Sequence, residues 1–253
     1  MQQVRLKILS NKSLTSDVYQ MRLVGNDKDA FCAIDSAQAG QFVNIAVDGC
    51  FLRRPFSICD IENGNICIVY KVIGEGTSVL KHMPSGEYLD VLIPLGNGFN
   101  PSKAGDKPLL VGGGLGTAPL LLLAKELKKT GKEVDVILGF NSKQDIILVD
   151  EFRNIGCNLV ITTADGSVGQ KGFVTDAIKI FDANEKNTYF YACGPIPMLR
   201  ALYHEMKIKG EMSLEERMGC GFGVCMGCTC KTSSGAKQVC TDGPVFITDD
   251  LIF

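Results

Sequence analysis

The sequence has no apolar run that approaches the roughly 20 residues needed to cross a membrane as a helix. Its first ten residues also lack the apolar core of about 7–15 residues that marks a secretory signal peptide. Without either segment, the chain is expected to be cytoplasmic and to have no membrane partner.

Runs of Lys or Arg are missing as well, and the formal net charge is −2. A nucleic-acid-binding surface needs clustered positive charge, so we expect no nucleic-acid partner. Histidine is scarce, because His82 and His204 are the only two and both lie in helical patterns. No Ser/His/Asp set or pair of carboxylates stands out, so no catalytic arrangement of those kinds is predicted.

Cysteine, by contrast, is abundant, with eleven residues. Thiolates at the spacing C-x4-C-x2-C, followed by a further cysteine, are typical of plant-type [2Fe–2S] ligation. A structural zinc site could use the same four thiolates and stays open at this point. Cys230 lies two residues beyond the third of them and is interpreted as a packed neighbour. The four residues of the pattern are Cys220, Cys225, Cys228 and Cys240.

Short β segments separated by turns fill the first hundred residues. Because no long helical pattern lies among them, the expected structure is a closed antiparallel barrel. Asn63-Gly64-Asn65 predicts a hairpin turn. The predicted strands are Val4–Ile8, Val18–Leu23, Gln41–Val47, Ile66–Val72 and Tyr88–Ile93.

Strands and helices alternate from residue 107 to about residue 207, which indicates a doubly wound parallel sheet with helices on both faces. Beyond Gly210 the helical pattern ends, and the metal is expected to shape the tail. The predicted strands are Lys107–Val111, Val134–Phe140, Leu159–Thr163 and Thr188–Ala192, and the predicted helices are Thr117–Lys129, Leu148–Ile155, Val174–Phe181 and Pro197–Lys207.

Two segments of the barrel have the chemistry of a flavin dinucleotide site. Arg54-Pro55-Phe56-Ser57 offers a guanidinium for phosphate, an aromatic ring for stacking and a hydroxyl for the flavin edge. Gly74-Glu75-Gly76-Thr77-Ser78 precedes a short helical stretch at Val79–His82, and the N-terminus of a helix favours anions. Alternatively, Arg54 forms a surface salt bridge and Gly76 only permits a turn.

The glycine-rich segment after the first strand of the sheet suits a pyrophosphate. Gly112-Gly113-Gly114-Leu115-Gly116-Thr117 joins a strand to a helix, where bare backbone amides can approach phosphate oxygens. It departs from G-x-G-x-x-G because Thr117 replaces the third glycine, and no Asp or Glu ends the second strand. Cys193-Gly194-Pro195 follows a later strand, where such sheets bind ligands, although Cys193 could instead pack as a small apolar residue.

Together these motifs predict an α+β multi-domain protein. Its parts are an N-terminal antiparallel β-barrel that binds FAD at residues 1–100, a nicotinamide-binding α/β domain with a doubly wound parallel sheet at 101–209, and a small C-terminal [2Fe–2S] domain at 210–253.

The order and spacing of Arg-Pro-Phe-Ser, Gly-Thr-Ser, Gly-Gly-Gly-Leu-Gly-Thr-Ala-Pro and Cys-Gly-Pro resemble those of the ferredoxin–NADP reductase superfamily over residues 1 to about 208. The tail, introduced by Leu214–Gly221 and closed by Cys240–Phe246, resembles that of the electron-transfer subunits of dihydroorotate dehydrogenase B, as does Asp165–Asp176. Simple reductases of the superfamily end soon after Cys-Gly-Pro with an aromatic residue over the flavin. This chain continues, so what covers the flavin is left open.

The resemblance implies roles for individual residues. Arg54, Pro55, Phe56 and Ser57 match the first FAD segment, Val69, Tyr70 and Lys71 the second, and Gly76 and Thr77 the pyrophosphate turn. Gly112, Gly113, Gly114, Gly116, Thr117, Gly194 and Pro195 match the nicotinamide-side motifs, with Cys193 as a candidate catalytic residue near the nicotinamide and the flavin. Cys220, Cys225, Cys228 and Cys240 match the cluster ligands.

The resemblance also implies an oxidoreductase subunit of the NAD-dependent dihydroorotate dehydrogenase of pyrimidine biosynthesis. Electrons would pass between NAD(H), FAD and a [2Fe–2S] cluster, and to and from the FMN of a catalytic dihydroorotate dehydrogenase subunit in a heterotetramer with two copies of each chain. A flavin is needed because nicotinamides transfer two electrons as hydride, whereas clusters accept one at a time. No orotate site stands out, as expected if the partner binds the substrate.

Two other functions stay open. A related flavin and iron–sulfur subunit could serve another acceptor, as in a sulfide dehydrogenase or an NADH-dependent ferredoxin:NADP oxidoreductase, although the Glu215–Gly221 segment favours the dihydroorotate dehydrogenase family. A zinc-stabilised binding module without redox function would be colourless. The choice of NADH over NADPH follows from the resemblance alone.

Overall fold

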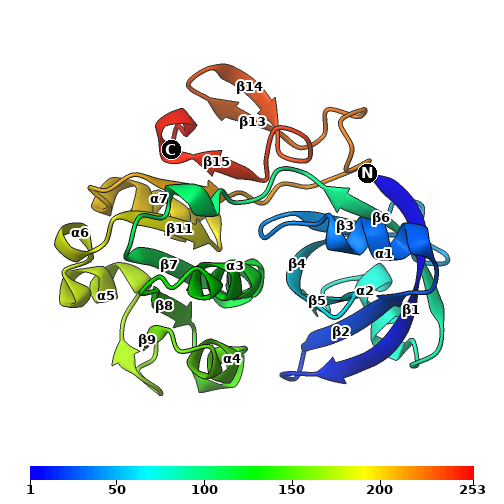
Figure 1. Cartoon of the computed structure of the whole chain (residues 1–253), viewed down its shortest axis with the longest axis horizontal. Helices are drawn as coiled ribbons and strands as arrows, with labels where there is room; N and C mark the ends of the chain where they lie inside the picture. Colours follow the sequence, from blue (N-terminus) through cyan, green and yellow to red (C-terminus); the bar gives the residue numbers. More distant parts are fainter.

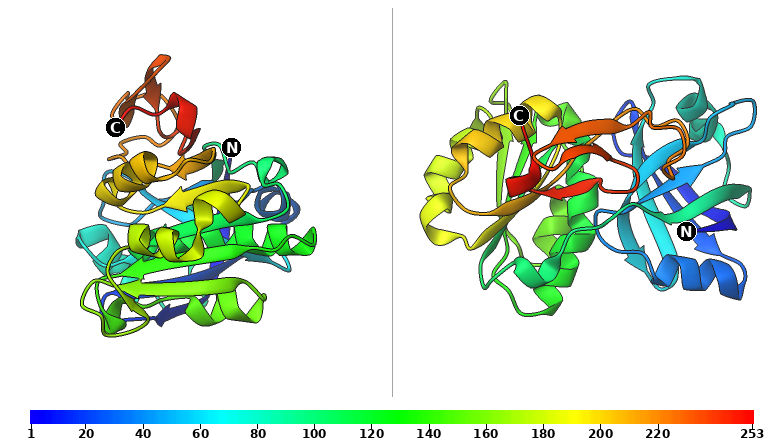
Figure 2. Two further views of the ribbon diagram at one scale, coloured as in Figure 1. Left: turned by 90° about the vertical axis from the view of Figure 1, so that its left-hand side faces the viewer. Right: turned by 90° about the horizontal axis from the view of Figure 1, so that it is seen from above.

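The structure is a computed structural model that describes the backbone of residues 1–253 and the side chains of residues 1–179 and 181–253. A β-barrel lies beside an α/β sheet, and the C-terminal segment lies above both (Figure 1). Seen from above, this orange and red segment crosses the junction between the barrel and the sheet (Figure 2).

The predicted antiparallel barrel is confirmed. Its strands close in the order β1-β2-β5-β4-β3-β6, with β6 pairing back to β1. One face of each strand points inward, so buried side chains alternate along β6 at Leu89, Val91 and Ile93. The strands are β1 (Gln2–Ser13), β2 (Val18–Gly25), β3 (Phe42–Ile45), β4 (Arg54–Glu62), β5 (Asn65–Lys71) and β6 (Tyr88–Leu95), and the helices of this region are α1 (Lys28–Asp35) and α2 (Glu75–His82).

The barrel contains elements that the sequence pattern did not predict. β4 has Pro55 at its second position, and proline obscures a strand because it cannot donate to the ladder. The turn at residues 63–64 joins β4 to β5, and Asn63 and Gly64 have φ values of 51° and 72°, as a tight hairpin turn requires. α1 is short and begins where the Asp27 carboxylate accepts the N–H of Ala30 at 2.8 Å.

The predicted doubly wound sheet is also confirmed. Its order is β10-β9-β8-β7-β11-β12-β15, and all neighbours are parallel except β12 and β15. α3 and α4 cover the side that faces the barrel, and α5, α6 and α7 cover the other (Figure 1). The strands are β7 (Pro108–Gly113), β8 (Asp135–Phe140), β9 (Asn158–Thr163), β10 (Gln170–Lys171), β11 (Tyr189–Cys193), β12 (Gly210–Ser213) and β15 (Val245–Ile247), and the α-helices are α3 (Ala118–Lys129), α4 (Val149–Asn154), α5 (Val174–Phe181), α6 (Ala183–Lys186) and α7 (Ile196–Glu205).

The four short elements β10, β12, β15 and α6 were missed because two to four residues carry no readable periodicity. Four 3₁₀ turns complete the chain with the two-stranded hairpin of β13 and β14. They are η1 (Pro101–Lys103), η2 (Gly114–Thr117), η3 (Lys143–Asp145) and η4 (Thr248–Asp250), and the hairpin strands are β13 (Thr229–Thr232) and β14 (Gly235–Gln238).

The predicted divisions at residues 100/101 and 209/210 stay predictions, but the packing crosses both. One apolar core joins barrel residues such as Ile58 to α3 residues such as Leu121. The other joins Met212 of the sheet to Val239 and Cys240 of the C-terminal segment. The three parts therefore stabilise one another through shared cores. Among the described helices, none is both long and apolar enough to span a membrane.

A buried ion pair links the barrel to α3. Lys125 Nζ lies 2.7 Å from Asp60 Oδ2 of β4, and the two side chains are 25% and 5% exposed. A carboxylate this deeply buried depends on its partner, because solvation by water is largely lost.

We expect Lys125→Met to lower the free energy of unfolding by about 2 kcal/mol, less than for a fully buried pair because Lys125 retains some water. Urea unfolding of the cofactor-loaded protein measures this change. Lys186→Met is the control, since its pair with Asp182 is 58% and 61% exposed, and should cost no more than about 0.5 kcal/mol. Equal losses in the two variants would contradict the linking role of Lys125.

Candidate functional site

A cavity of about 1060 Å³ opens between the barrel and the sheet. It is lined by every residue that the sequence assigned to FAD: Arg54, Pro55, Phe56, Ser57, Val69, Tyr70, Lys71, Gly76 and Thr77. We call it the flavin cavity. The structure thus brings together two segments of β4 and β5 and the start of α2, which lie some distance apart in the sequence.

Aromatic rings form one wall of the flavin cavity. The rings of Phe56 and Tyr70 lie 5.5 Å apart, and Tyr70 stacks on Tyr19 at 5.9 Å. The Tyr70 hydroxyl donates to Asn11 Oδ1 at 2.9 Å, and burial raises the pKa of Tyr70 to about 12. Tyr70 is therefore a fixed, neutral surface on which a planar ring can pack.

The first turn of α2 suits a phosphate. The first amides of a helix have no partner within the helix, so they are free to bind an anion. The Thr77 hydroxyl accepts the N–H groups of Ile73 and Gly74 and holds this turn in place. A Cβ at Gly76 would lie 2.6 Å from Arg54 Nε, so the glycine leaves room for the guanidinium beside the helix N-terminus. This arrangement fits a diphosphate between Arg54 and α2.

The question of what covers the flavin receives a structural answer. The segment from Ser213 to Met218, which leads from β12 to the first cluster cysteine, lines the flavin cavity together with Pro244. Sequence reasoning recognised this segment as an approach to the cluster and missed its place in the cavity.

Cys193 ends β11 and lines the flavin cavity. It is 2% exposed, and burial, followed by the negative charge of Glu215, raises its pKa to about 12. Burial therefore favours the neutral thiol over the thiolate at this position. The catalytic role of Cys193 stays a prediction. Its side chain lines the flavin cavity and is not among the residues that line the nucleotide cavity described below.

A second cavity, of about 630 Å³, lies at the carboxyl ends of the parallel strands. We call it the nucleotide cavity. It sits beside the point where β7 has β8 on one side and β11 on the other, which is where open α/β sheets bind ligands. Of the predicted nicotinamide-side residues, the cavity is lined by Gly113, Gly114, Gly116, Gly194 and Pro195.

Gly112 and Thr117 lie behind this lining. A Cβ at Gly112 would stand 3.1 Å from both Leu138 Cδ2 and Thr117 Cα, so the glycine allows the strand and the loop to pack closely. Thr117 is fully buried, and its hydroxyl has no partner among the described residues. Their predicted contact with the nucleotide stays a prediction, and the geometry assigns them a packing role.

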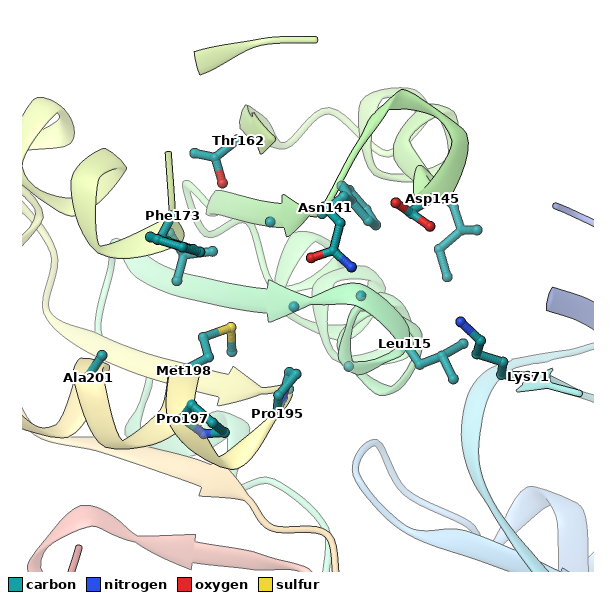
Figure 3. Close-up of a pocket in the computed structure, with 18 of the residues that line it drawn as sticks. Lys71, Leu115, Asn141, Asp145, Thr162, Phe173, Pro195, Pro197, Met198 and Ala201 are labelled. Carbon is teal, nitrogen blue, oxygen red and sulfur yellow. The ribbon is translucent and has the colours of Figure 1, made fainter. Parts of the chain in front are cut away.

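Several lining residues of the nucleotide cavity were not predicted. Figure 3 shows Asn141, Asp145, Thr162 and Phe173 on one side of the cavity and Met198 on the other. Asn141 and Thr162 stand at the ends of β8 and β9, so the rule that ligands bind at carboxyl strand ends could have found them. Phe173 and Met198 have no local signal, since an aromatic or a methionine in a helix pattern more often marks a core.

The two cavities share three lining residues: Lys71, Leu115 and Glu215. Lys71 reaches from the barrel toward Leu115 and Asp145 (Figure 3). It forms an ion pair with Asp17 at 2.9 Å, and this partner raises the pKa of Lys71. The two cavities therefore adjoin at these three residues, which we call the common wall.

The four cysteines of the tail form two pairs. Cys220 and Cys225 each receive the other's backbone N–H at 3.4 Å, and Cys228 receives the N–H of Cys240 at 3.4 Å. Burial raises the pKa of Cys240 to about 12, with further contributions from Cys228 and from the charge of Cys220, so the two pairs lie near each other. In the described part of the chain, no group of three or more His, Cys, Asp or Glu side chains is already gathered around one point.

The residues present nevertheless fit an iron–sulfur cluster. Backbone amides of Phe222, Val224 and Cys225 point at Cys220 Sγ at 3.3–3.5 Å. Partial burial raises the pKa of Cys220, but these amides outweigh it and lower the pKa to about 6, which favours the thiolate that binds metal. A Cβ at Gly219 would stand 3.1 Å from Cys225 Sγ, so glycine keeps this space open.

A barrel with a dinucleotide-sized cavity, set against the switch point of a doubly wound sheet, defines a reductase of the ferredoxin–NADP reductase type. A family model described as the iron-sulfur cluster binding domain of dihydroorotate dehydrogenase B matches residues 215–252, and one described as an oxidoreductase NAD-binding domain matches residues 110–204.

Curated relatives cover nearly the whole chain. Two are named dihydroorotate dehydrogenase B (NAD(+)), electron transfer subunit. The one from Fusobacterium nucleatum is 41% identical over 252 residues, 95% of each chain, and the one from Bacillus pumilus is 42% identical over 262 residues, 99% of this chain and 98% of its own. The chain belongs to the family of electron-transfer subunits of dihydroorotate dehydrogenase B.

Solved structures agree with this fold. An NADH-dependent reduced ferredoxin–NADP oxidoreductase is similar with a TM-score of 0.85 and 31% identity, covering 98% of this chain and 89% of that one. A cytochrome P450 reductase of Amycolatopsis shares the fold at 21% identity and a TM-score of 0.69, covering 81% and 66%.

We expect Gly76→Ala to lower the affinity for FAD by roughly tenfold, because the added methyl group displaces the Arg54 guanidinium from its place beside α2. Titration of the flavin-free protein with FAD measures this change. Val79→Ala is the control in the same helix, since Val79 is 37% exposed and is not among the residues that line the flavin cavity, and it should bind FAD as the wild type does. Equal affinity in the two variants would show that Arg54 does not hold the diphosphate.

We expect Cys228→Ala to remove the cluster absorbance and most of the iron, whereas Cys230→Ala keeps both. Cys228 pairs with Cys240, while Cys230 lies in β13 opposite Lys237. Iron and acid-labile sulfide per chain are the measured quantities. Loss of iron in the Cys230 variant would make Cys230 a ligand and overturn the assignment.

Proposed function

We propose that the chain passes electrons between NAD(H), an FAD in the flavin cavity and a [2Fe–2S] cluster held by Cys220, Cys225, Cys228 and Cys240. From the cluster, electrons pass to or from the FMN of a catalytic dihydroorotate dehydrogenase subunit. The bound flavin supplies the exchange between hydride and single electrons that nicotinamide and cluster chemistry require. The observation that carries the proposal is the order in space of nucleotide cavity, flavin cavity and cysteine loop.

The protein's own residues position the reactants. Arg54 and the first turn of α2 hold the flavin diphosphate, and Phe56 and Tyr70 provide an apolar surface for the ring. Gly114 leaves its backbone open to the nicotinamide dinucleotide, whereas Gly113 and Gly116 let the loop pack against Met198 and the Cys193 carbonyl. The common wall of Lys71, Leu115 and Glu215 then determines how closely the nicotinamide and flavin rings can approach.

The cover formed by residues 213–218 has two effects. It encloses the flavin cavity on the side of the C-terminal segment, which restricts water at the reacting ring. It also leads directly into Cys220, so the wall of the flavin cavity and the cluster loop are one continuous stretch of chain. This continuity supports single-electron transfer from flavin to cluster.

An exposed apolar surface surrounds the cysteine loop. Phe222, Val224 and Met226 are 41%, 75% and 60% exposed, and Cys225 between them is also exposed. Apolar side chains gathered in this way mark protein interaction sites. They support docking of the catalytic subunit over the cluster, in an assembly with two copies of each chain. The cytoplasmic location is part of the same proposal, because thiolate ligands need a compartment that keeps thiols reduced.

The likeness to the ferredoxin–NADP oxidoreductase structure supports a second candidate, in which another acceptor takes the electrons. The decisive measurement is anaerobic NADH oxidation with orotate as acceptor, with and without the co-expressed FMN-containing subunit. We expect orotate-dependent turnover only when both chains are present.

Cys228→Ala provides the control for this assay. In that variant NADH should still bleach the flavin, while orotate turnover is lost. If wild-type flavin is bleached by NADH but the complex reduces no orotate, the reductase assignment stands and the acceptor is a different one. If NADH leaves the flavin unchanged, the proposed electron path is wrong.

A further inference from the structure

Strand β3 contacts both proposed cofactor sites. On one side it pairs with β4, where Phe42 lies opposite Ser57 and Asn44 lies opposite Pro55. Phe42 itself lines the flavin cavity. Two residues further along the same face of the strand, Asn44 Nδ2 donates a hydrogen bond to the backbone carbonyl of Cys220 at 2.9 Å. Three residues of β3, from Phe42 to Asn44, therefore span the interval from the flavin wall to the first cluster cysteine.

The contact between Asn44 and the cysteine loop is tight. Asn44 is 1% exposed, and its own carbonyl accepts from Arg53 at 3.3 Å, while Arg53 is held by Asp90 at 2.9 Å. Gly221 has a φ of +81°, and a Cβ there would stand only 2.5 Å from Asn44 Nδ2. The loop backbone thus lies directly on the amide group, which only a glycine at position 221 permits.

Only the donor half of the Asn44 amide is used. Among the described residues, Asn44 Oδ1 finds no hydrogen-bond donor although it is buried. An unsatisfied buried acceptor lowers the stability of the folded protein. The stability of the barrel alone therefore does not explain why an amide side chain stands at this position. What the amide does is fix the Cys220–Gly221 peptide, and amides later in this loop donate to Cys220 Sγ. The orientation of that peptide sets the direction of the Cys220 thiolate.

We propose that Asn44 is a positioning residue for the cluster: its amide ties the ligand Cys220 to the strand that walls the flavin cavity and so fixes the cluster relative to the flavin. The inference rests on the proposed function and adds to it the residue that couples the two sites. Cys220 is thereby the ligand whose backbone is bonded to the barrel. Hydrogen-bonding partners behind metal ligands typically change metal affinity by about 10–100-fold when they are removed.

The first test is Asn44→Leu, which keeps the shape of the side chain and removes the donor. We expect chelators to remove iron about tenfold faster and the reduced cluster to show altered EPR g values. FAD content and the rate of flavin bleaching by NADH should match the wild type. Transfer from the reduced flavin to the cluster, followed by stopped flow, should be slower.

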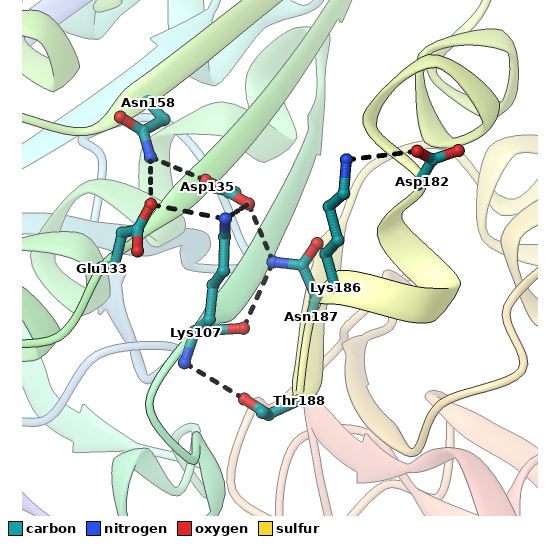
Figure 4. A network of polar contacts seen from close by, with 8 residues as sticks. All are labelled: Lys107, Glu133, Asp135, Asn158, Asp182, Lys186, Asn187 and Thr188. Carbon is teal, nitrogen blue, oxygen red and sulfur yellow. Dashed lines mark hydrogen bonds and ion pairs between the residues drawn. The ribbon is translucent and has the colours of Figure 1, made fainter.

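Asn187→Leu is the matched control. Asn187 is 5% exposed, its Nδ2 donates to the Lys107 carbonyl at 3.2 Å and to Asp135 at 3.0 Å, and its Oδ1 also lacks a partner among the described residues. It lies in the polar network at the amino ends of the sheet strands (Figure 4). A merely structural role would lower the melting temperature in both variants and leave both EPR spectra unchanged.

A second pair of variants, this time at glycines, tests the same contact between Asn44 and the cysteine loop. It tests the positioning role of Asn44 even if Asn44→Leu does not fold. Gly221→Ala pushes a methyl group against Asn44, whereas Gly64→Ala carries similar backbone strain, with a φ of +72°, and contacts the Phe31 ring instead. Gly223 is no control, because its backbone amide hydrogen-bonds the cluster ligand Cys240. We expect altered g values in Gly221→Ala but not in Gly64→Ala, in the barrel hairpin. Wild-type g values and iron retention in Asn44→Leu and Gly221→Ala would overturn the inference. A wild-type protein that holds no cluster would instead overturn the proposed function.

Discussion

The packing of α3 against β4 is the contact on which both cavities depend. β4 begins with the residues that wall the flavin cavity, and α3 begins where the glycine loop of the nucleotide cavity ends. Leu115, just before α3, lines both cavities, and the buried pair of Lys125 and Asp60 fixes the helix on the strand. Because a close-packed core cannot deform continuously, the distance between the two ligands is a property of this interface.

Much of the site could be predicted because its chemistry restricts residue types within short segments. Arg54–Ser57 combines a guanidinium, an aromatic ring and a hydroxyl, and glycines stand between a strand and a helix at Gly112–Gly116. Both patterns can be recognised from the sequence alone. The structure places these segments on two adjoining cavities, as expected for a superfamily whose motifs follow a fixed order. The four-cysteine pattern is readable for the same reason, since ligand spacing is constrained by the metal.

The remaining residues could not be predicted, since their positions depend on tertiary packing. Thr162 and Phe173 meet in the nucleotide cavity only because β9 and α5 are brought to the same edge of the sheet. Glu215 reads as part of a cluster motif, but its place in the common wall depends on β12 joining the sheet. Asn44 belongs to no motif at all, and its contact with Cys220 spans 176 positions of sequence. Short elements such as β12 and β15 could not be predicted for a different reason: three or four residues are too few to show a hydrophobic periodicity.

The cover of the flavin cavity also constrains how the protein is made. Residues 213–218 and Pro244 lie more than a hundred positions beyond β6, the last strand of the barrel. When a ribosome has completed the barrel, the cavity still lacks this wall. The barrel strands are therefore synthesised before the segments that complete its cavity. The complete wall of the flavin cavity therefore forms only when β12 and β15 have joined the sheet and brought residues 213–218 and Pro244 against the barrel.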